Sequence, residues 1–170
     1  MSNANEKERE QHFRALLEIE YGRLRRIARS YAREGEHQDL LQEILLQIWR
    51  ALPGFAGRAQ RSTWVYRIAL NTALGALRKR YARPDMQTMS HDQLLPLASA
   101  SIGDPVDADA LLDAFLAALE PLDRAVLMLS LDDLSHADIA EITGLSPNAV
   151  GIRLNRIKQS FNHTYVEGHP

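Results

Sequence analysis

The sequence contains no cysteine, no long hydrophobic run and no recognisable catalytic motif. Without cysteine the chain cannot form a disulfide or a thiolate metal site, and it cannot sense redox state through its own thiols. It has no run of about 18 apolar residues and no signal-peptide pattern at its charged N-terminus, so we expect a cytoplasmic protein without membrane insertion.

The six histidines show no HExxH spacing, and neither a Gly-rich phosphate loop nor a nucleophile elbow is present. We therefore predict that the protein is not an enzyme, with no catalytic residue, no metal site and no cofactor.

The charge distribution is the first positive signal. The chain has 170 residues, 45% of them hydrophobic, which fits one ordinary domain or two small ones. Its net charge of -2 hides an asymmetry: residues 1–83 contain 16 Lys and Arg against 9 Asp and Glu, whereas the remainder contains 4 against 13. Such a division suggests separate surfaces for separate partners, with the basic part better suited to nucleic acid.

Helical periodicity divides the chain into two parts. Apolar residues recur at helical spacing from about residue 6 to 32, 39 to 52 and 63 to 81, with Ser62 as the expected N-cap of the third helix. Residues 84–106 are rich in Pro, Ser, Met and Asp without a sustained period, which predicts a flexible linker. We predict an all-α fold of two small helical domains, 1–83 and 107–170, the second beginning with a cap at Asp107.

Four successive capping signals follow the linker. Ser135 with Asp138 forms an acidic variant of the capping box, and Gly144 suits the left-handed position after a short helix. Ser146 is then an N-cap, and Pro147 occupies the first helical position. A short helix, a turn with glycine and a longer amphipathic helix make a helix-turn-helix. An ordinary helical hairpin is the alternative.

The helix from Pro147 has two different faces. Its apolar stripe consists of Val150, Leu154, Ile157 and Phe161. On the opposite face Asn148, Ile152 and Asn155 could meet base edges in a major groove. Arg153 and Arg156 flank that face and would suit phosphates, which position a helix without reading sequence.

The third helix of the basic domain also divides into two faces. Trp64, Arg67 and Asn71 share one face, a combination that suits unstacked bases. The cluster from Arg78 to Arg80 adds charge that can neutralise phosphates. A lone Trp is otherwise more often a core residue. The predicted core positions of this helix are Val65, Ile68, Ala69, Thr72 and Ala76.

The second helix combines a predicted buried stripe with a polar face around one apolar residue, Leu46. An exposed Leu needs no explanation by itself, but it also fits an interface with an apolar centre and a polar rim. The stripe comprises Leu41, Leu45, Ile48 and Leu52; the opposite face comprises Asp39, Gln42, Glu43, Leu46 and Arg50.

These segments carry a family resemblance. "DLLQEILLQIW", Phe55, "TWVYRIALN" and "LRKR" resemble region 2 of bacterial extracytoplasmic-function (ECF) sigma factors, of sigma-70 group 4. "ALEPLDRAVLMLSLDDLSHADIAEITGLSPNAVGIRLNRIK" is similar to their region 4. The resemblance implies that 1–83 is sigma region 2, 84–106 the linker and 107–170 sigma region 4.

The resemblance also implies three sets of site residues and three partners. Core RNA polymerase would be bound through the clamp helices of its largest subunit and through its flap region, promoter DNA would be recognised and opened, and an anti-sigma factor would regulate the protein. The implied polymerase-binding residues are Asp39, Gln42, Glu43, Leu46, Trp49 and Arg50. The implied minus-ten residues are Phe55, Arg61, Trp64, Arg67, Asn71 and Arg78. The implied minus-thirty-five residues are Ser146, Pro147, Asn148, Ala149, Ile152, Arg153, Asn155 and Arg156.

The sequence departs from the common family pattern at several positions. Arg61, Leu70 and Gly75 stand where the family often has Phe, Arg and Asp, and Gly151 stands where it often has Lys. Two alternatives therefore remain: a sigma-like decoy that occupies an anti-sigma factor without reaching promoters, and a stand-alone helix-turn-helix regulator. The basic first domain argues against the stand-alone regulator.

Overall fold

The computed structural model describes residues 2–57, 60–82 and 108–165, with side chains from residue 6 in the first range and from residue 110 in the last. Throughout these ranges the regular elements are helices, which confirms the predicted all-α class. The chain divides into two compact units, Met1–Arg80 and Tyr81–Pro170. The predicted linker, 84–106, and the predicted cap at Asp107 lie outside the described residues.

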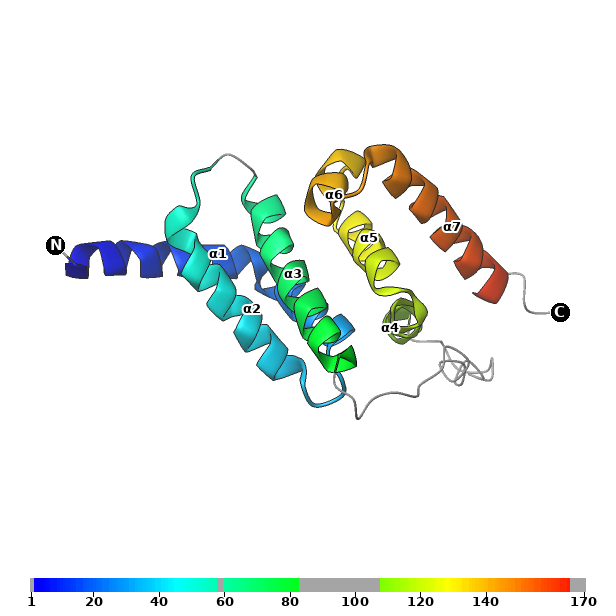
Figure 1. The fold of residues 1–170 in the computed structure, drawn as a ribbon, viewed down its shortest axis with the longest axis horizontal. Coiled ribbons are helices and arrows are strands. Elements are labelled where there is room, and N and C mark those ends of the chain that lie inside the picture. Colours follow the sequence, from blue (N-terminus) through cyan, green and yellow to red (C-terminus); the bar gives the residue numbers. More distant parts are fainter. Residues whose placement is uncertain (1, 58–59, 83–107, 166–170) are drawn as a thin grey trace. The chain divides into compact units, whose positions relative to one another are not determined.

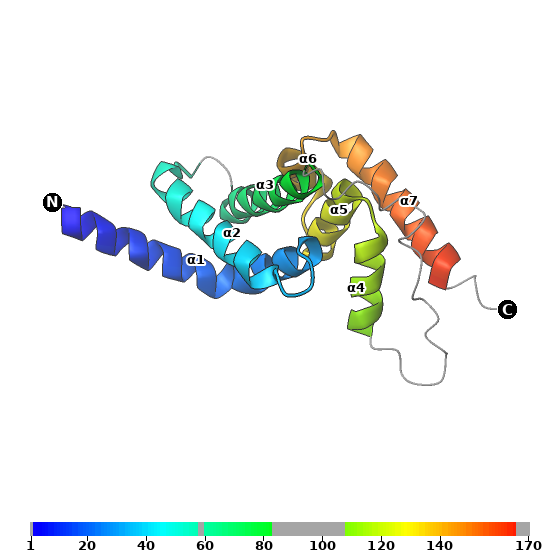
Figure 2. The ribbon, with the colours of Figure 1, turned by 60° about the horizontal axis from the view of Figure 1, so that its bottom comes forward.

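The described residues of the first unit form three α-helices and one short 3-10 helix. A turn in which Gly35 has a φ of 84° separates the first two helices, because glycine adopts this left-handed conformation without steric cost. Two views show the N-terminal turns of the first helix extending past the other helices of the unit (Figures 1 and 2). The elements are α1 (Ser2–Tyr31), α2 (His37–Ala51), η1 (Leu52–Gly54) and α3 (Arg61–Tyr81).

The core of the first unit differs in detail from the predicted stripes. In α2, Leu41 and Ile48 are buried as predicted, but Ile44 is fully buried, whereas Leu45 and Leu52 are only half-buried. In α3 the buried sector is wider than predicted and includes Leu70. The buried residues of α3 are Thr63, Val65, Tyr66, Ala69, Leu70 and Ala73; Ile68, Thr72 and Ala76 of the predicted set are half-buried.

The start of α3 contradicts one prediction. The helix begins at Arg61, and the amide of Trp64 donates to the carbonyl of Gln60. Ser62 therefore lies inside the first turn and is not the N-cap. A Ser cap contributes only about 1 kcal/mol, so packing of the surrounding chain can start a helix one or two residues away from it.

In the second unit, the part of the chain that the structure describes, 108–165, forms a cluster of four helices. Pro121 begins one of them at the first helical position, as predicted, where its missing N–H costs no hydrogen bond. The buried stripe of the last helix contains Val150, Leu154 and Ile157, while Phe161 is half-buried with its ring 5.0 Å from that of Phe115. The elements are α4 (Ala108–Ala118), α5 (Pro121–Leu131), α6 (His136–Thr143) and α7 (Pro147–Tyr165).

Candidate nucleic-acid and polymerase interfaces

The helix-turn-helix of α6 and α7 is built by the predicted caps. The hydroxyl of Ser135 accepts from the amide of Asp138 at 3.1 Å, and the Asp138 carboxylate accepts from the Ser135 amide, which completes a capping box. Gly144 ends α6 with a φ of 77°. The hydroxyl of Ser146 then accepts from the amide of Ala149 at 3.2 Å and caps α7. Three residues, 144–146, thus turn the chain between the two helices.

The outer face of α7 is exposed as the sequence indicates. Asn148 and Asn155 are exposed, and Ile152 between them is 62% exposed although it is a large apolar residue. A branched apolar side chain left in water beside two amides suits contact with a thymine methyl and with base edges. Ser146 and Pro147 are exposed at the start of the helix, where a phosphate would meet its positive end.

Arg153 and Arg156 have a partner that sequence reasoning missed. Both guanidinium groups donate to the carboxylate of Asp123 on α5, each at 2.5 Å and each to a different oxygen. Asp123 is 5% exposed. In the sequence this Asp is explained by its place in the first turn of a helix, where an acidic residue suits the dipole. The sequence carries no local signal for this contact, because Asp123 lies 30 and 33 residues before the two arginines.

Two further positions of the second unit, Ala149 and Gly151, lie beside the outer face of α7. Ala149 of the predicted minus-thirty-five set is half-buried, because it lies on the flank of α7 and not on the outer face. Gly151 faces His136 of α6: a Cβ atom added there would lie 3.5 Å from the imidazole ring, which is ordinary contact. The side chain of any larger residue at position 151 would therefore extend alongside the imidazole ring of His136.

In the first unit, Phe55 and Trp64 form the candidate minus-ten surface. Their ring centroids are 4.8 Å apart, and both side chains are half-buried. Trp64 is therefore neither a core residue nor a freely exposed platform; it lies at the edge of the loop before α3. Arg67 is half-buried one turn further along α3, and Asn71 is exposed beyond it.

The remaining basic residues of this surface lie at its two ends. Arg61 and Arg78 are exposed in the first and last turns of α3, and Arg80 forms an ion pair with Glu36 at 3.4 Å. Leu70, which stands where the family often has Arg, is 4% exposed and belongs to the core. At this position the chain therefore has a core residue in place of a charged side chain.

The polar face of α2 is exposed as predicted, but Trp49, which the family resemblance adds to the polymerase-binding residues, is half-buried. Leu46 is 40% exposed, and beside it the amide of Gln47 donates to the Glu43 carboxylate at 2.6 Å. Trp49 does not belong to this exposed patch. The exposed patch comprises Asp39, Gln42, Glu43, Leu46 and Arg50.

Trp49 packs instead against the N-terminal part of α1. The ring of Phe13 meets it edge-on at 5.2 Å, and the guanidinium of Arg9 lies 4.0 Å above its centroid. Arg9 also donates to the carbonyl oxygen of Trp49. The prediction for Trp49 overlooked this contact, because nothing in the periodicity of α2 shows that α1 passes over its C-terminal end.

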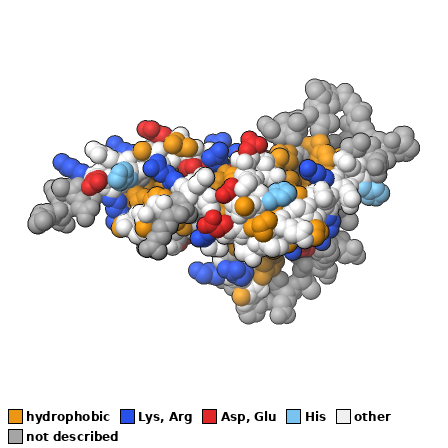
Figure 3. All heavy atoms as spheres, turned by 90° about the horizontal axis from the view of Figure 1, so that it is seen from above, with side chains coloured by type: hydrophobic (Ala, Val, Ile, Leu, Met, Phe, Trp, Pro, Cys, Tyr) orange, Lys and Arg blue, Asp and Glu red, His pale blue; other side chains and the backbone are white. Residues whose placement is uncertain are grey.

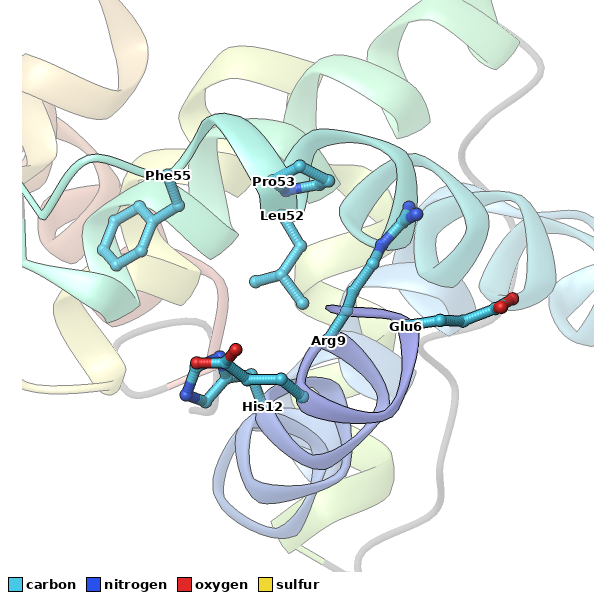
Figure 4. A pocket seen from close by; sticks show the side chains of 7 residues that line it. Glu6, Arg9, His12, Leu52, Pro53 and Phe55 are labelled. Atoms are coloured by element: carbon cyan, nitrogen blue, oxygen red, sulfur yellow. The ribbon is translucent and has the colours of Figure 1, made fainter. Parts of the chain in front are cut away.

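An open groove lies where α1 passes η1. Its volume is about 540 Å³. Arg9 extends along η1, Leu52 points towards α1, and Glu6 points away (Figure 4).

Seen from one side, acidic, basic and hydrophobic side chains alternate over the described surface (Figure 3). The described residues include no group of three His, Asp or Glu able to hold a metal ion, and none of their helices has the length and hydrophobicity to cross a membrane.

The described helices and the capped turn between α6 and α7 define a class: a two-unit helical protein whose second unit carries a helix-turn-helix. Two family models match the chain, sigma-70 region 2 over residues 16–83 and sigma-70 region 4 over residues 109–161. The chain belongs to the extracytoplasmic-function group (group 4) of the sigma-70 family of RNA polymerase sigma factors.

Two curated relatives are representative. The ECF RNA polymerase sigma factor SigG of Mycobacterium tuberculosis is 33% identical over 149 aligned residues, which cover 73% of this chain and 40% of that protein. The ECF RNA polymerase sigma-E factor of Escherichia coli K12 is 27% identical, covering 78% of this chain and 75% of that protein. The chain thus spans less than half the length of the mycobacterial relative.

Two solved structures share the fold. CnrH in complex with the cytosolic domain of CnrY gives a TM-score of 0.65 at 22% identity, covering 91% of this chain and 88% of that one. The sigma factor RpoE in complex with the anti-sigma factor NepR from Bartonella quintana gives 0.69 at 21% identity, covering 90% and 96%.

Proposed function

We propose that the protein is an alternative sigma factor that binds core RNA polymerase and directs it to specific promoters. In this role 1–83 acts as sigma region 2, 84–106 as the linker and 107–170 as sigma region 4, and the protein has no catalytic activity of its own. The observation that carries the proposal is the presence, in one chain and in family order, of a basic unit matched by sigma region 2 and of a capped helix-turn-helix matched by region 4.

The polymerase would be bound by the exposed patch of α2. Leu46 supplies an apolar centre, and Glu43 and Arg50 belong to a polar rim, as in interfaces between proteins that also exist apart. The partners proposed for this patch and for the second unit are the clamp helices of the largest subunit and the flap region, respectively. Trp49, on the same helix, contacts Phe13 of α1 and ties the C-terminal end of α2 to that helix.

Promoter DNA would be bound by both units. In the first, Trp64 and Asn71 would hold unstacked bases of the minus-ten element while Arg61 and Arg78 neutralise phosphates. In the second, the exposed face of α7 would read the minus-thirty-five element from the major groove. Ser146 and Pro147 fix the residue at which α7 begins. Ala149 is half-buried, so in this proposal it packs at the flank of α7.

An anti-sigma factor is proposed as a further partner, since both structural neighbours are complexes of a sigma-type chain with a second protein, named as an anti-sigma factor in one of them. The decoy alternative drew on Leu70 and Gly151. Leu70 is a core residue and Gly151 faces His136, so neither position carries a charged side chain for DNA, and both departures continue to favour the decoy.

Transcription in vitro with core polymerase over a library of random promoters tests the proposal. We expect transcripts only when the chain is added, from a set of templates that share two short elements. Core polymerase without the chain is the control. Binding to core polymerase with no selected templates would support the decoy, and binding to DNA alone with no effect of polymerase would support the stand-alone regulator.

A further inference from the structure

A buried carboxylate ties α5 to the recognition helix. Asp123 lies in the first turn of α5, and its two oxygens each accept from a different arginine of α7, Arg153 and Arg156, at 2.5 Å. The pairs join residues 30 and 33 positions apart in the sequence. Among the described residues, this cluster links the apolar core of the second unit to the side of α7 that borders its outer face.

The three charged groups of this cluster differ in burial: the carboxylate lies deeper than the two guanidinium groups. A carboxylate that is removed from water is tolerated when opposite charges and hydrogen bonds compensate it, and here two guanidinium groups do so. The Asp123 side chain is 8% exposed, whereas that of Arg156 is 65% exposed. The negative charge therefore lies beneath the surface and the positive charges lie towards it. Together the three residues carry a net charge of about +1, from two guanidinium groups and one carboxylate.

We propose that Asp123 is a positioning residue for DNA recognition: it holds Arg153 and Arg156 as one fixed pair that sets the rotation of α7 in the groove. This inference rests on the proposed function of α7. Each guanidinium has five N–H donors in a planar fork, and Asp123 engages one nitrogen of each, so the same arginines can also donate to phosphate oxygens.

Fixed arginines favour one register of the helix on the duplex. Phosphate contacts orient a protein without reading sequence, so their geometry decides whether Asn148 and Asn155 reach the intended base pairs. An arginine released from its carboxylate regains side-chain freedom and can follow phosphates in several registers. It also presents its full charge to the DNA. Loss of Asp123 should therefore increase unspecific attraction and reduce discrimination together.

The test uses the full chain assembled with core polymerase, with Asp123→Asn as the variant. Binding is measured at several salt concentrations to a selected promoter and to the same fragment with an altered minus-thirty-five element. We expect the dependence of log affinity on log salt to steepen by about one unit, because one more positive charge is available to phosphates. Discrimination between the two fragments should fall several-fold, while affinity for the altered fragment is kept or increased.

A merely structural role predicts a different outcome. Destabilisation of the second unit would weaken binding to both fragments by a common factor without a steeper salt dependence, and that result would overturn the proposal. Asp113→Asn on α4 is the matched control, since it removes one exposed carboxylate from the same unit. An equal steepening in this control would show that net charge alone is responsible, which also overturns the proposal.

Two further variants separate charge from geometry. In Asp123→Asn with Arg156→Gln the net charge of the cluster returns to its original value, so we expect the original salt dependence with discrimination still reduced. Asp123→Glu keeps the charge but lengthens the side chain; it should retain the salt dependence and lose discrimination. If Asp123→Asn fails to fold in thermal unfolding, Asp123→Glu carries the test, and unchanged discrimination there would overturn the proposal.

The same experiment distinguishes the two levels of the hypothesis. If the wild-type chain with core polymerase does not discriminate between the two fragments, the proposed function of α7 fails. If the wild type discriminates and the Asp123 variants discriminate equally well with the original salt dependence, only the positioning role of Asp123 fails.

Discussion

The ring of Phe55 packs against that of Trp64, with centroids 4.8 Å apart and planes inclined by 44°. Phe55 directly follows η1, and Trp64 lies in the first turn of α3. An unstacked base that reaches Trp64 therefore meets an aromatic pair and not an isolated ring. Asn71, exposed two turns further along α3, offers the hydrogen-bonding group beside it.

The first prediction concerns strand opening. We expect Trp64→Ala combined with Asn71→Ala to reduce permanganate reactivity in the minus-ten region more than it reduces polymerase binding, because stacking contributes about 1–3 kcal/mol per base. Phe55→Ala should produce a smaller loss in the same direction. Opening at the wild-type level in the double variant would mean that Trp64 only packs against Phe55.

The second prediction concerns the exposed patch of α2. Leu46→Arg and Glu43→Arg should each weaken binding to core polymerase in a pull-down, since an unpaired charge at an interface centre and a reversed rim charge both oppose association. The fold should persist, because both side chains are exposed. Ile19→Arg on α1 is the control, as Ile19 is 65% exposed and outside the patch. An equal loss in this control would show that the effect is not specific to α2.

The third prediction concerns base reading by α7. Asn155→Ala should change which minus-thirty-five sequences are selected from a random library, because a bidentate amide contributes roughly 1–3 kcal/mol of discrimination at one base pair. Lys158→Ala removes an exposed positive charge from the flank of α7 opposite Arg156. It should lower affinity for all sequences alike, because phosphate contacts do not read sequence. A library profile that is unchanged by Asn155→Ala would remove this residue from the reading face.

The fourth prediction concerns the core of the second unit. Leu154→Ala should lower its free energy of unfolding by about 2–5 kcal/mol, because Leu154 is buried against the preceding helices. Ile152→Ala, two residues away on the exposed face, should change stability by less than about 0.5 kcal/mol. Denaturant unfolding of both variants, monitored by circular dichroism, makes the comparison. Similar losses in both would mean that the two faces of α7 are wrongly assigned.

Local signals explain which parts of the fold were predictable. The capping box at Ser135, the left-handed Gly144 and the cap at Ser146 involve neighbours in the chain, so the sequence displays them directly. The position of Ser62 was misjudged, because the start of α3 depends on packing as well as on cap preference. The buried Ile44 was missed for a similar reason: helical periodicity gives the direction of a face, but not how far neighbouring helices cover it.

Contacts between distant residues account for the rest. Asp123 meets Arg153 and Arg156 across about thirty residues of chain, and Trp49 meets Phe13 and Arg9 through the crossing of α1 over α2. No period of 2 or 3.6 residues encodes such meetings. The centres of the exposed faces of α2 and α7, such as Leu46 and Asn155, were predictable, since each requires only the side of its own helix that faces away from the core. The partial burial of Trp49 and Ala149 was not, because it depends on neighbouring helices.

The packing of Trp49 and Trp64 has a spectroscopic consequence. The sequence contains two tryptophans, and both lie in the unit Met1–Arg80. Tryptophan fluorescence therefore reports on that unit and does not change when the helix-turn-helix unfolds. Circular dichroism still detects that unfolding. Within the first unit, Trp49 would report separation of α1 from α2, and Trp64 would report rearrangement beside Phe55. Replacing either tryptophan with phenylalanine leaves one fluorescent indole, so the remaining emission reports on the surroundings of that one residue.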